Sequence, residues 1–376
     1  MSSTSTRLPT PEGPGHWLAE QASGEMLTAP TEFLAPRWLA MSFFGAHREA
    51  GTDVLPSEGL LPPFEGATGW LNSEPLTPEG LRGRVVAVQF WTYTCVNWLR
   101  TLPYVREWAA KYHDQGLSVI GVHTPEFGFE RNVDNVIAAA REMRVDYPIA
   151  LDSNYAVWGA FANHFWPALY IADEQGRIRY HHFGEGEYAM SEMAVQQLLG
   201  EAGKEGFDPA LVSVEPQGTE VAADWSNLRT PETYLSYGRA YGFASPDGER
   251  FDEPHDYPEP SHLSLNQWAP SGVWTLAEHA AVLGEAPGRI AIRFHARDVN
   301  LVMGPAERGV SVPFRVLIDG EPPGAAHGTD VDEQGNGTVS EQRLYQLIRQ
   351  PKPIADRLFE IEFLDSGVEA YCFTFG

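Results

Sequence analysis

The sequence predicts an α/β domain built on a mixed central sheet, followed by an all-β sandwich resembling a jelly roll. Three observations carry this prediction. Strand-like and helix-like segments alternate between Leu81 and Leu199, whereas short strand-like segments separated by turns fill the chain beyond residue 219. A stretch rich in Gly, Lys, Glu and Pro lies between the two regions. The length of 376 residues also exceeds what one hydrophobic core usually organises.

In the first domain, apolar runs of strand length alternate with amphipathic patterns. Val85–Trp91 is apolar and rich in β-branched residues, which predicts a buried strand. The pattern then changes to a helix over Val96–His113 that ends before Gly116. Further strands are predicted at 117–122, 149–151, 168–172 and 177–183, and further helices at 132–143, 155–164 and 190–199. Strands alternating with helices, then one hairpin and a last helix, indicate a mixed sheet covered on both faces.

The second domain has the pattern of a sandwich of short strands. Five strands are predicted, at 290–296, 299–303, 314–318, 359–363 and 370–375, with turns at Asp319-Gly320 and Gly335-Asn336-Gly337 between them. The predicted organisation is an N-terminal extension at 1–60, the first domain at 61–205, a linker at 206–219 and the β-sandwich at 220–376.

Charge and composition narrow the classes of partner. The chain has 51 acidic and 26 basic residues, a formal charge of −25, which disfavours nucleic acid as a partner. Its N-terminus has no apolar stretch behind a positive flank, and the apolar region Phe33–Phe44 is too short to span a bilayer. Two cysteines make no disulfide framework. We therefore expect a cytoplasmic protein without a membrane span.

Cys95 is the candidate catalytic residue. It lies where the strand ending at Trp91 gives way to the helix beginning at Val96. Unpaired backbone N–H groups and the positive end of a helix favour a thiolate at such a position. A cysteine in that setting has its pKa lowered from about 8.5 toward roughly 3.5–7.5. We therefore expect Cys95 to be an activated nucleophile.

Several segments resemble the thioredoxin-like superfamily, which includes the AhpC/TSA-related redoxins, and in particular the soluble C-terminal region of DipZ-type proteins. The segments that carry the resemblance are Gly69–Asn72, Leu81–Gly83, Phe90–Cys95, Arg100–Val105, Gly121–Phe127, Trp166–Ala168, His182–Gly186, Thr230–Leu235 and Phe373–Gly376. The resemblance implies a thioredoxin fold joined to a sandwich similar to a carbohydrate-binding module. It also implies that Pro103 kinks the first helix, and that Pro167, after Trp166, is a cis-proline beside the thiol and shapes a substrate groove.

The sequence departs from the dithiol pattern at Trp98. In a dithiol enzyme the second cysteine, three positions after the first, releases the mixed disulfide, but this chain has tryptophan there. An external low-molecular-weight thiol or thiol protein is therefore expected to resolve the adduct, and no cofactor is expected. Cys372, in a predicted buried strand at the far end of the second domain, is not expected to take part.

The residues around Cys95 suggest the shape of the site. Trp91, Tyr93, Trp98 and Trp166 are expected to line an apolar cleft suited to a disulfide or a small hydrophobic substrate. Filling of the groove left by the missing cysteine is the alternative. Asn97 is a candidate hydrogen-bond donor near the sulfur.

Three other functions stay open. A degenerate thioredoxin domain would serve as a redox-inactive binding protein or scaffold. A one-cysteine peroxidase is suggested by Thr92, three residues before Cys95, although Val88 stands where the peroxiredoxin motif has proline. Non-redox covalent chemistry on a small molecule is the third.

No metal site is predicted. His123, His164, His181 and His182 are dispersed along the first domain and have no paired cysteines beside them.

The second domain is expected to provide recognition or assembly. Sugar binding would use aromatic side chains, for which the candidates are Trp225, Tyr234, Tyr237, Tyr241, Trp268 and Trp274. Packing against the first domain and formation of a homo-oligomer are the alternatives.

Overall fold

The computed structural model describes residues 54–204 and 206–376, so most of the predicted extension at 1–60 lies outside the described residues. Among the described residues, no helix has both the length and the apolar character needed to cross a membrane. Residues Ser57–Gly376 cluster by their contacts as one unit that holds both predicted domains.

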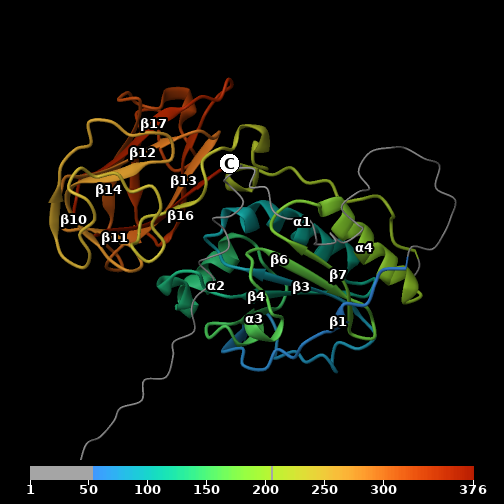
Figure 1. Cartoon of the computed structure of the whole chain (residues 1–376). Coiled ribbons are helices and arrows are strands. Elements are labelled where there is room, and N and C mark those ends of the chain that lie inside the picture. The colour runs from blue at the N-terminus through green and yellow to red at the C-terminus, as the bar shows by residue number, and fades with distance from the viewer. Residues whose placement is uncertain (1–53, 205) are drawn as a thin grey trace, which may run out of the picture. The chain divides into compact units, whose positions relative to one another are not determined.

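The first domain contains a seven-stranded mixed sheet, in the order β1-β7-β6-β3-β4-β5-β2 (Figure 1). The central β3 (Val85–Trp91) runs parallel to β4 (Leu117–His123) and antiparallel to β6 (Ala168–Ala172). The remaining strands are β1 (Gly59–Leu60), β2 (Gly69–Leu71), β5 (Ile149–Leu151) and β7 (Arg177–Phe183). All seven residues of β3 are buried, which fits a strand covered on both faces.

Helices cover both faces of this sheet. The helices are α1 (Val96–Tyr112), α2 (Val133–Glu142), α3 (Ala156–Ala160) and α4 (Tyr188–Glu201). On one face, Val86, Val88 and Phe90 of β3 share an apolar cluster with Val157 and Trp158 of α3. The alternate residues of a strand point to the opposite face.

On that opposite face, α1 packs beside α4 (Figure 1). Trp108 and Tyr112 of α1 donate hydrogen bonds to the Glu192 carboxylate of α4, at 3.2 and 2.6 Å. Pro103 lies inside α1, as the resemblance implied. The predicted mixed sheet with helices on both faces is confirmed.

The second domain is all-β, as predicted, and its strands surround a large apolar core. The main path of pairing is β15-β14-β17-β12-β10-β11-β18-β13-β16, with β8 on β18 and β9 on β10. The strands are β8 (Thr233–Tyr234), β9 (His255–Tyr257), β10 (Trp268–Leu276), β11 (Ala281–Leu283), β12 (Gly288–Phe294), β13 (Asp298–Pro305), β14 (Val312–Ile318), β15 (Asn336–Val339), β16 (Arg343–Arg349), β17 (Arg357–Phe363) and β18 (Val368–Phe375).

Strand β10 joins the two layers of the second domain. Its residues Trp268–Ser271 pair with β12, whereas Gly272–Leu276 pair with β9 and β11. The change of partner occurs at Gly272, whose φ of +93° is a left-handed conformation that glycine adopts without strain.

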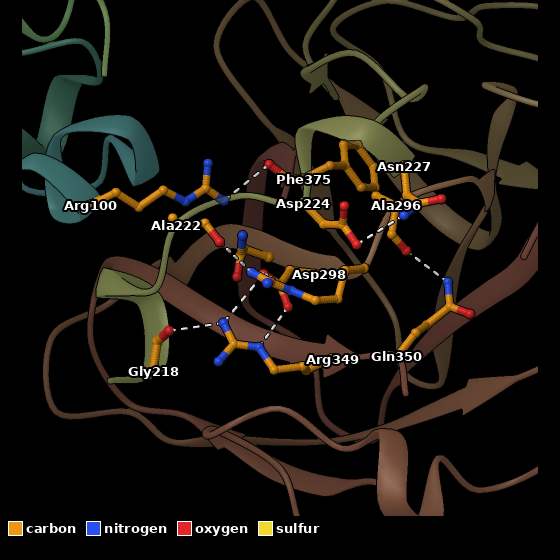
Figure 2. Close-up of polar contacts among 12 residues, drawn as sticks. Arg100, Gly218, Ala222, Asp224, Asn227, Ala296, Asp298, Arg349, Gln350 and Phe375 are labelled. Atoms are coloured by element: carbon orange, nitrogen blue, oxygen red, sulfur yellow. Dashed lines mark hydrogen bonds and ion pairs between the residues drawn. The ribbon is translucent and has the colours of Figure 1, made fainter. Parts of the chain in front are cut away.

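The segment between the domains is held at its C-terminal end by arginines (Figure 2). Arg349 donates to the Gly218 carbonyl oxygen at 2.9 Å and to the Asp298 carboxylate at 2.8 Å. Arg106 of α1 forms an ion pair with Glu220 at 2.7 Å. These contacts fix the point where the chain enters the second domain.

Candidate functional site

Cys95 is the N-cap residue of α1 and is a partly exposed residue. Its thiol donates to the carbonyl oxygen of Trp166 at 3.7 Å. The Trp166-Pro167 peptide bond is cis, as the resemblance implied. Structure and sequence therefore agree that the strand–helix junction and the cis-proline loop meet at the Cys95 sulfur.

The expected activation of Cys95 is wrong in its direction. The surrounding protein shields the sulfur from water, and this desolvation, with the negative charges of Glu126 and Glu232, raises the pKa of the Cys95 thiol well above its ordinary value. Backbone N–H groups of Trp98 and Asn97 lower the pKa, the Trp98 group by more than Glu232 raises it, but they do not reverse the shift. Desolvation and the two carboxylates together outweigh these N–H groups at the start of α1.

Trp98 fills the interior beneath Cys95. It is fully buried, its ring stacks on Trp91 with centroids 4.3 Å apart, and its Nε1–H donates to Oε1 of Gln89 at 3.1 Å. Room for Trp91 depends on Gly121, because a Cβ there would lie 2.7 Å from the Trp91 Nε1. The tryptophan that replaces the second cysteine is thus integrated into the core.

Three of the four aromatics expected to line an open cleft are core residues. Trp91 and Trp98 are 0% exposed and Tyr93 only 3%, because they point into the domain beneath the turn. Trp166 is only partly buried, and its Nε1–H donates to the carbonyl oxygen of Thr124 at 3.0 Å. Filling of the space left by the second cysteine, the alternative interpretation, describes Trp98 better.

The polar site residues predicted from the sequence take different places. Thr92 is fully buried. The Asn97 side-chain oxygen accepts a bond from Arg100 at 3.4 Å, and its backbone N–H is directed to the Cys95 sulfur. His123 is a core residue that stacks on Tyr93, and burial lowers its pKa to about 3.

Glu130 is a site residue that sequence reasoning missed. Its carboxylate is 1% exposed and accepts the Thr94 hydroxyl at 2.6 Å, next to Cys95 in the chain. It also accepts the backbone N–H groups of Glu126 and Phe127, at 2.6 and 2.9 Å. Burial raises the pKa of Glu130 to about 7. Glu130 therefore connects the Cys95 turn to the loop that carries Glu126.

Two residues of the second domain, Arg239 and Tyr234, contact this loop. The sequence did not predict that they share one site. Arg239 donates to the Glu126 carboxylate at 2.8 Å, and the Tyr234 hydroxyl donates to the carboxylates of Glu126 and Glu232. The Arg239 guanidinium lies 3.5 Å from the centroid of the Tyr234 ring. No local sequence pattern predicts this cluster, because Arg239 and Glu126 are 113 positions apart.

Aromatic contacts surround the same loop. Tyr371 of β18 packs on Phe127 and Phe129, with ring centroids 5.3 and 4.9 Å apart. Cys372 is 1% exposed, as a buried strand residue was expected to be. It pairs in register with Tyr234, however, so its strand lies beside the Glu126 loop and not at a remote end of the second domain.

A second contact between the domains involves the first helix (Figure 2). Arg100 of α1, 2% exposed, donates to the Phe375 carbonyl oxygen at 3.3 Å. Its guanidinium also pairs with the buried Glu185 carboxylate at 2.7 Å. Helix α1, which Cys95 caps, is thus tied to β18 through Arg100, about one turn after Cys95.

Comparisons with known proteins find similar sequences for both domains. A family model described as Redoxin matches residues 59–198, and one described as "Thioredoxin like C-terminal domain" matches residues 230–376. The thiol-disulfide oxidoreductase YkuV of Bacillus subtilis is 31% identical over 132 residues, which cover 35% of this chain and 88% of that protein. The chain belongs to the thioredoxin-like redoxin family.

Two further proteins similar to this thioredoxin-like chain match different shares of its length. Protein DipZ of Mycobacterium tuberculosis is 40% identical over 262 residues, which are 68% of this chain and 36% of DipZ. The chain therefore spans about a third of that relative. A solution structure of a thioredoxin-like protein in the oxidized form is 32% identical, covers 38% of this chain and 96% of its own, and superposes with a TM-score of 0.36.

The six aromatics proposed for sugar binding in this thioredoxin-like protein do not share one surface. Trp268 and Trp274 are 0% exposed core residues, and Tyr234 belongs to the Glu126 cluster. Tyr237 is half-buried, and only Trp225 and Tyr241 are largely exposed. The expectation fails for Trp268 and Trp274 because they point into the apolar core.

Within residues 54–204 and 206–376, no three or more His, Cys, Asp or Glu side chains are grouped so as to hold a metal ion.

Proposed function

We propose that this thioredoxin-like protein exchanges thiols and disulfides through a single cysteine, Cys95. The observation that carries the proposal is the position of Cys95, a partly exposed residue at the start of α1 whose sulfur lies 3.7 Å from the carbonyl oxygen of Trp166, the residue before cis-Pro167. The relationship to a thiol-disulfide oxidoreductase such as YkuV supports the same chemistry.

The proposed cycle has two exchange steps. The Cys95 thiol loses its proton to solvent, and the thiolate attacks a substrate disulfide RSSR′. A Cys95–SR bond forms while the S–S bond of the substrate breaks, and R′S⁻ leaves and takes up a proton. An external thiolate R″S⁻ then attacks the SR sulfur, which regenerates Cys95 and yields RSSR″. Electrons balance without another oxidant, since one disulfide is consumed and one is formed.

The external thiol is part of the proposal because neither candidate position for a resolving sulfur offers an accessible thiol. Trp98 stands at the second position of the motif, and Cys372 is 1% exposed within β18. A low-molecular-weight thiol or a thiol protein would take this role.

The test is turnover of bis(2-hydroxyethyl) disulfide with glutathione as the external thiol. We expect Cys95→Ser to abolish turnover above the uncatalysed rate, and Cys372→Ser to retain it. Equal rates for the wild type and Cys95→Ser would contradict the proposal.

The second candidate function is a binding protein or scaffold without redox activity. The raised pKa of Cys95 favours it, because only the thiolate is nucleophilic. In that case the wild type and Cys95→Ser would both be inactive. The peroxidase alternative has less support, because the Thr92 hydroxyl that suggested it belongs to a fully buried side chain.

A further inference from the structure

The loop from Thr124 to Glu126 is linked to the Cys95 sulfur through Trp166. The thiol donates to the Trp166 carbonyl oxygen, and the Trp166 indole donates in turn to the Thr124 carbonyl oxygen, two residues before Glu126. On the other side, the Glu126 backbone N–H is held by Glu130, whose carboxylate also accepts the Thr94 hydroxyl. Glu126 is therefore tied to the Cys95 turn by two independent chains of hydrogen bonds.

The side chain of Glu126 is held by the second domain. Its carboxylate accepts the Arg239 guanidinium at 2.8 Å and the Tyr234 hydroxyl, and its side chain is only 11% exposed. Arg239 is itself fixed by the Tyr234 ring beneath its guanidinium. A cation from one domain thus pairs with an anion of the loop that is hydrogen-bonded to the Cys95 site of the other domain.

We propose that Arg239 is a positioning residue of the Cys95 site, which holds and neutralises the Glu126 carboxylate so that the second domain sets the reactivity of the thiol. The inference rests on the proposed role of Cys95 as the nucleophile. It makes the site a two-domain site, because the first domain alone has Glu126 without its cation.

The charges around the thiol make the sign of the effect clear. Glu126 and Glu232 both disfavour the thiolate, and Arg239 offsets Glu126. Burial raises the pKa of both Glu130 and Glu232 to about 7. The other titratable groups of the cluster are the Tyr234 hydroxyl and the Cys372 thiol, whose pKa values are raised well above their ordinary values, mainly by burial. The Tyr234 hydroxyl and the Cys372 thiol are therefore neutral at physiological pH. Loss of Arg239 leaves one more uncompensated negative charge near Cys95.

The test is the pH dependence of iodoacetamide alkylation of Cys95, measured on the full chain by mass spectrometry of the Cys95 peptide. We expect Arg239→Gln to move the midpoint upward by about half to one pH unit. Arg239→Lys keeps the charge and should return the midpoint toward the wild-type value. Glu126→Gln should move it downward.

Arg308→Gln is the matched control. Arg308 is also an arginine of the second domain that bonds the first, through Asn135 at 2.6 Å, but it does not contact Glu126. Its removal changes the net charge equally and should leave the Cys95 profile unchanged.

Three outcomes would overturn the inference. The first is an Arg239→Gln profile equal to that of the wild type or of Arg308→Gln. The second is an Arg239→Lys profile equal to that of Arg239→Gln. The third is an undiminished effect of Arg239→Gln in the Glu126→Gln background, because Arg239 would then act independently of Glu126. Alkylation needs no disulfide substrate, so failure of exchange activity alone would overturn the proposed function and not this inference.

Discussion

The Trp98 Nε1–H donates a hydrogen bond to Oε1 of Gln89 at 3.1 Å, at the position where a dithiol enzyme has its second cysteine. The indole is fully buried and stacks on Trp91. Trp98, which stands where a dithiol enzyme has its resolving cysteine, therefore also packs in the core. The absence of a second cysteine from the motif and the stability of the domain are thus connected.

Restoration of the dithiol motif should be costly. Trp98→Cys leaves a cavity against Trp91 and removes the donor to Gln89, so we expect the free energy of unfolding to fall by about 3 to 5 kcal/mol. Urea denaturation measures this fall. Trp98→Phe keeps most of the volume and should lose less, and equal stability of the two variants would show that the cavity is not the cause.

Glu130 should make stability fall as pH rises. Its pKa is raised from 4.5 to about 7, so between these values the folded state holds a proton that the unfolded state has lost. The contribution of Glu130 to the free energy of unfolding is therefore largest in acid and falls, by up to about 3 kcal/mol, as the pH rises above 7. Glu130→Gln keeps the shape and removes the titration.

Denaturation of the wild type and Glu130→Gln from pH 5 to pH 8 tests this. The difference in stability between the two proteins should change in favour of the variant as pH rises. A constant difference would mean that Glu130 is ionised throughout.

Titration of His123 should make the stability of the folded protein rise as the pH rises, the opposite of the effect of Glu130. Burial lowers its pKa from 6.5 to about 3, so between these values the unfolded state binds a proton that the folded state excludes. Stability from this group is lost as pH falls below 6.5, by about 2 kcal/mol at pH 5. His123→Phe preserves the aromatic contacts with Tyr93 and Trp91, and thermal melts at pH 7 and pH 5 should show it less sensitive to acid than the wild type. A pH-independent difference between the two proteins would contradict this.

The buried Arg100–Glu185 pair should be costly to break from one side. Arg100→Met leaves the Glu185 carboxylate buried without its cation and removes the donor to Phe375, so we expect a loss of about 3 to 5 kcal/mol in denaturant unfolding. Adding Glu185→Gln to this variant removes the stranded charge and should recover part of the loss. Failure of the double variant to recover any stability would indicate that packing, and not charge, causes the loss.

Most of the first domain was predictable because its strands are continuous apolar runs. The bounds of β3, β5, β6 and β7 match the prediction residue for residue. The helix predicted at 155–164 is shorter, Ala156–Ala160, and the left-handed conformation of Ala162 follows soon after its end.

The second domain was harder to predict because its longest strand contains turn formers. Strand β10 includes Pro270 and Gly272, at the place where it passes between layers, and local patterns read these residues as a turn. Strand β16 was also not predicted, because polar residues interrupt its apolar pattern. These residues are Arg343 and Arg349 at its ends and Gln346 within it.

Within the site, the sequence predicted Cys95 and the cis-proline loop, because both lie in local motifs. It did not predict the raised pKa of the thiol, since that shift comes mainly from desolvation in the folded protein, to which the charges of Glu126 and of Glu232 in the other domain add. Contacts between distant segments leave no periodic signal in either segment.

The most direct test of Cys95 as a monothiol nucleophile is the intact mass of the protein after reaction with excess bis(2-hydroxyethyl) disulfide, before and after glutathione is added. We expect one 2-mercaptoethanol equivalent on Cys95, its absence in Cys95→Ser, its presence in Cys372→Ser, and its release by glutathione. A wild-type protein that stays unmodified while folded, or an adduct that glutathione does not release, would contradict the role of Cys95 as a monothiol nucleophile.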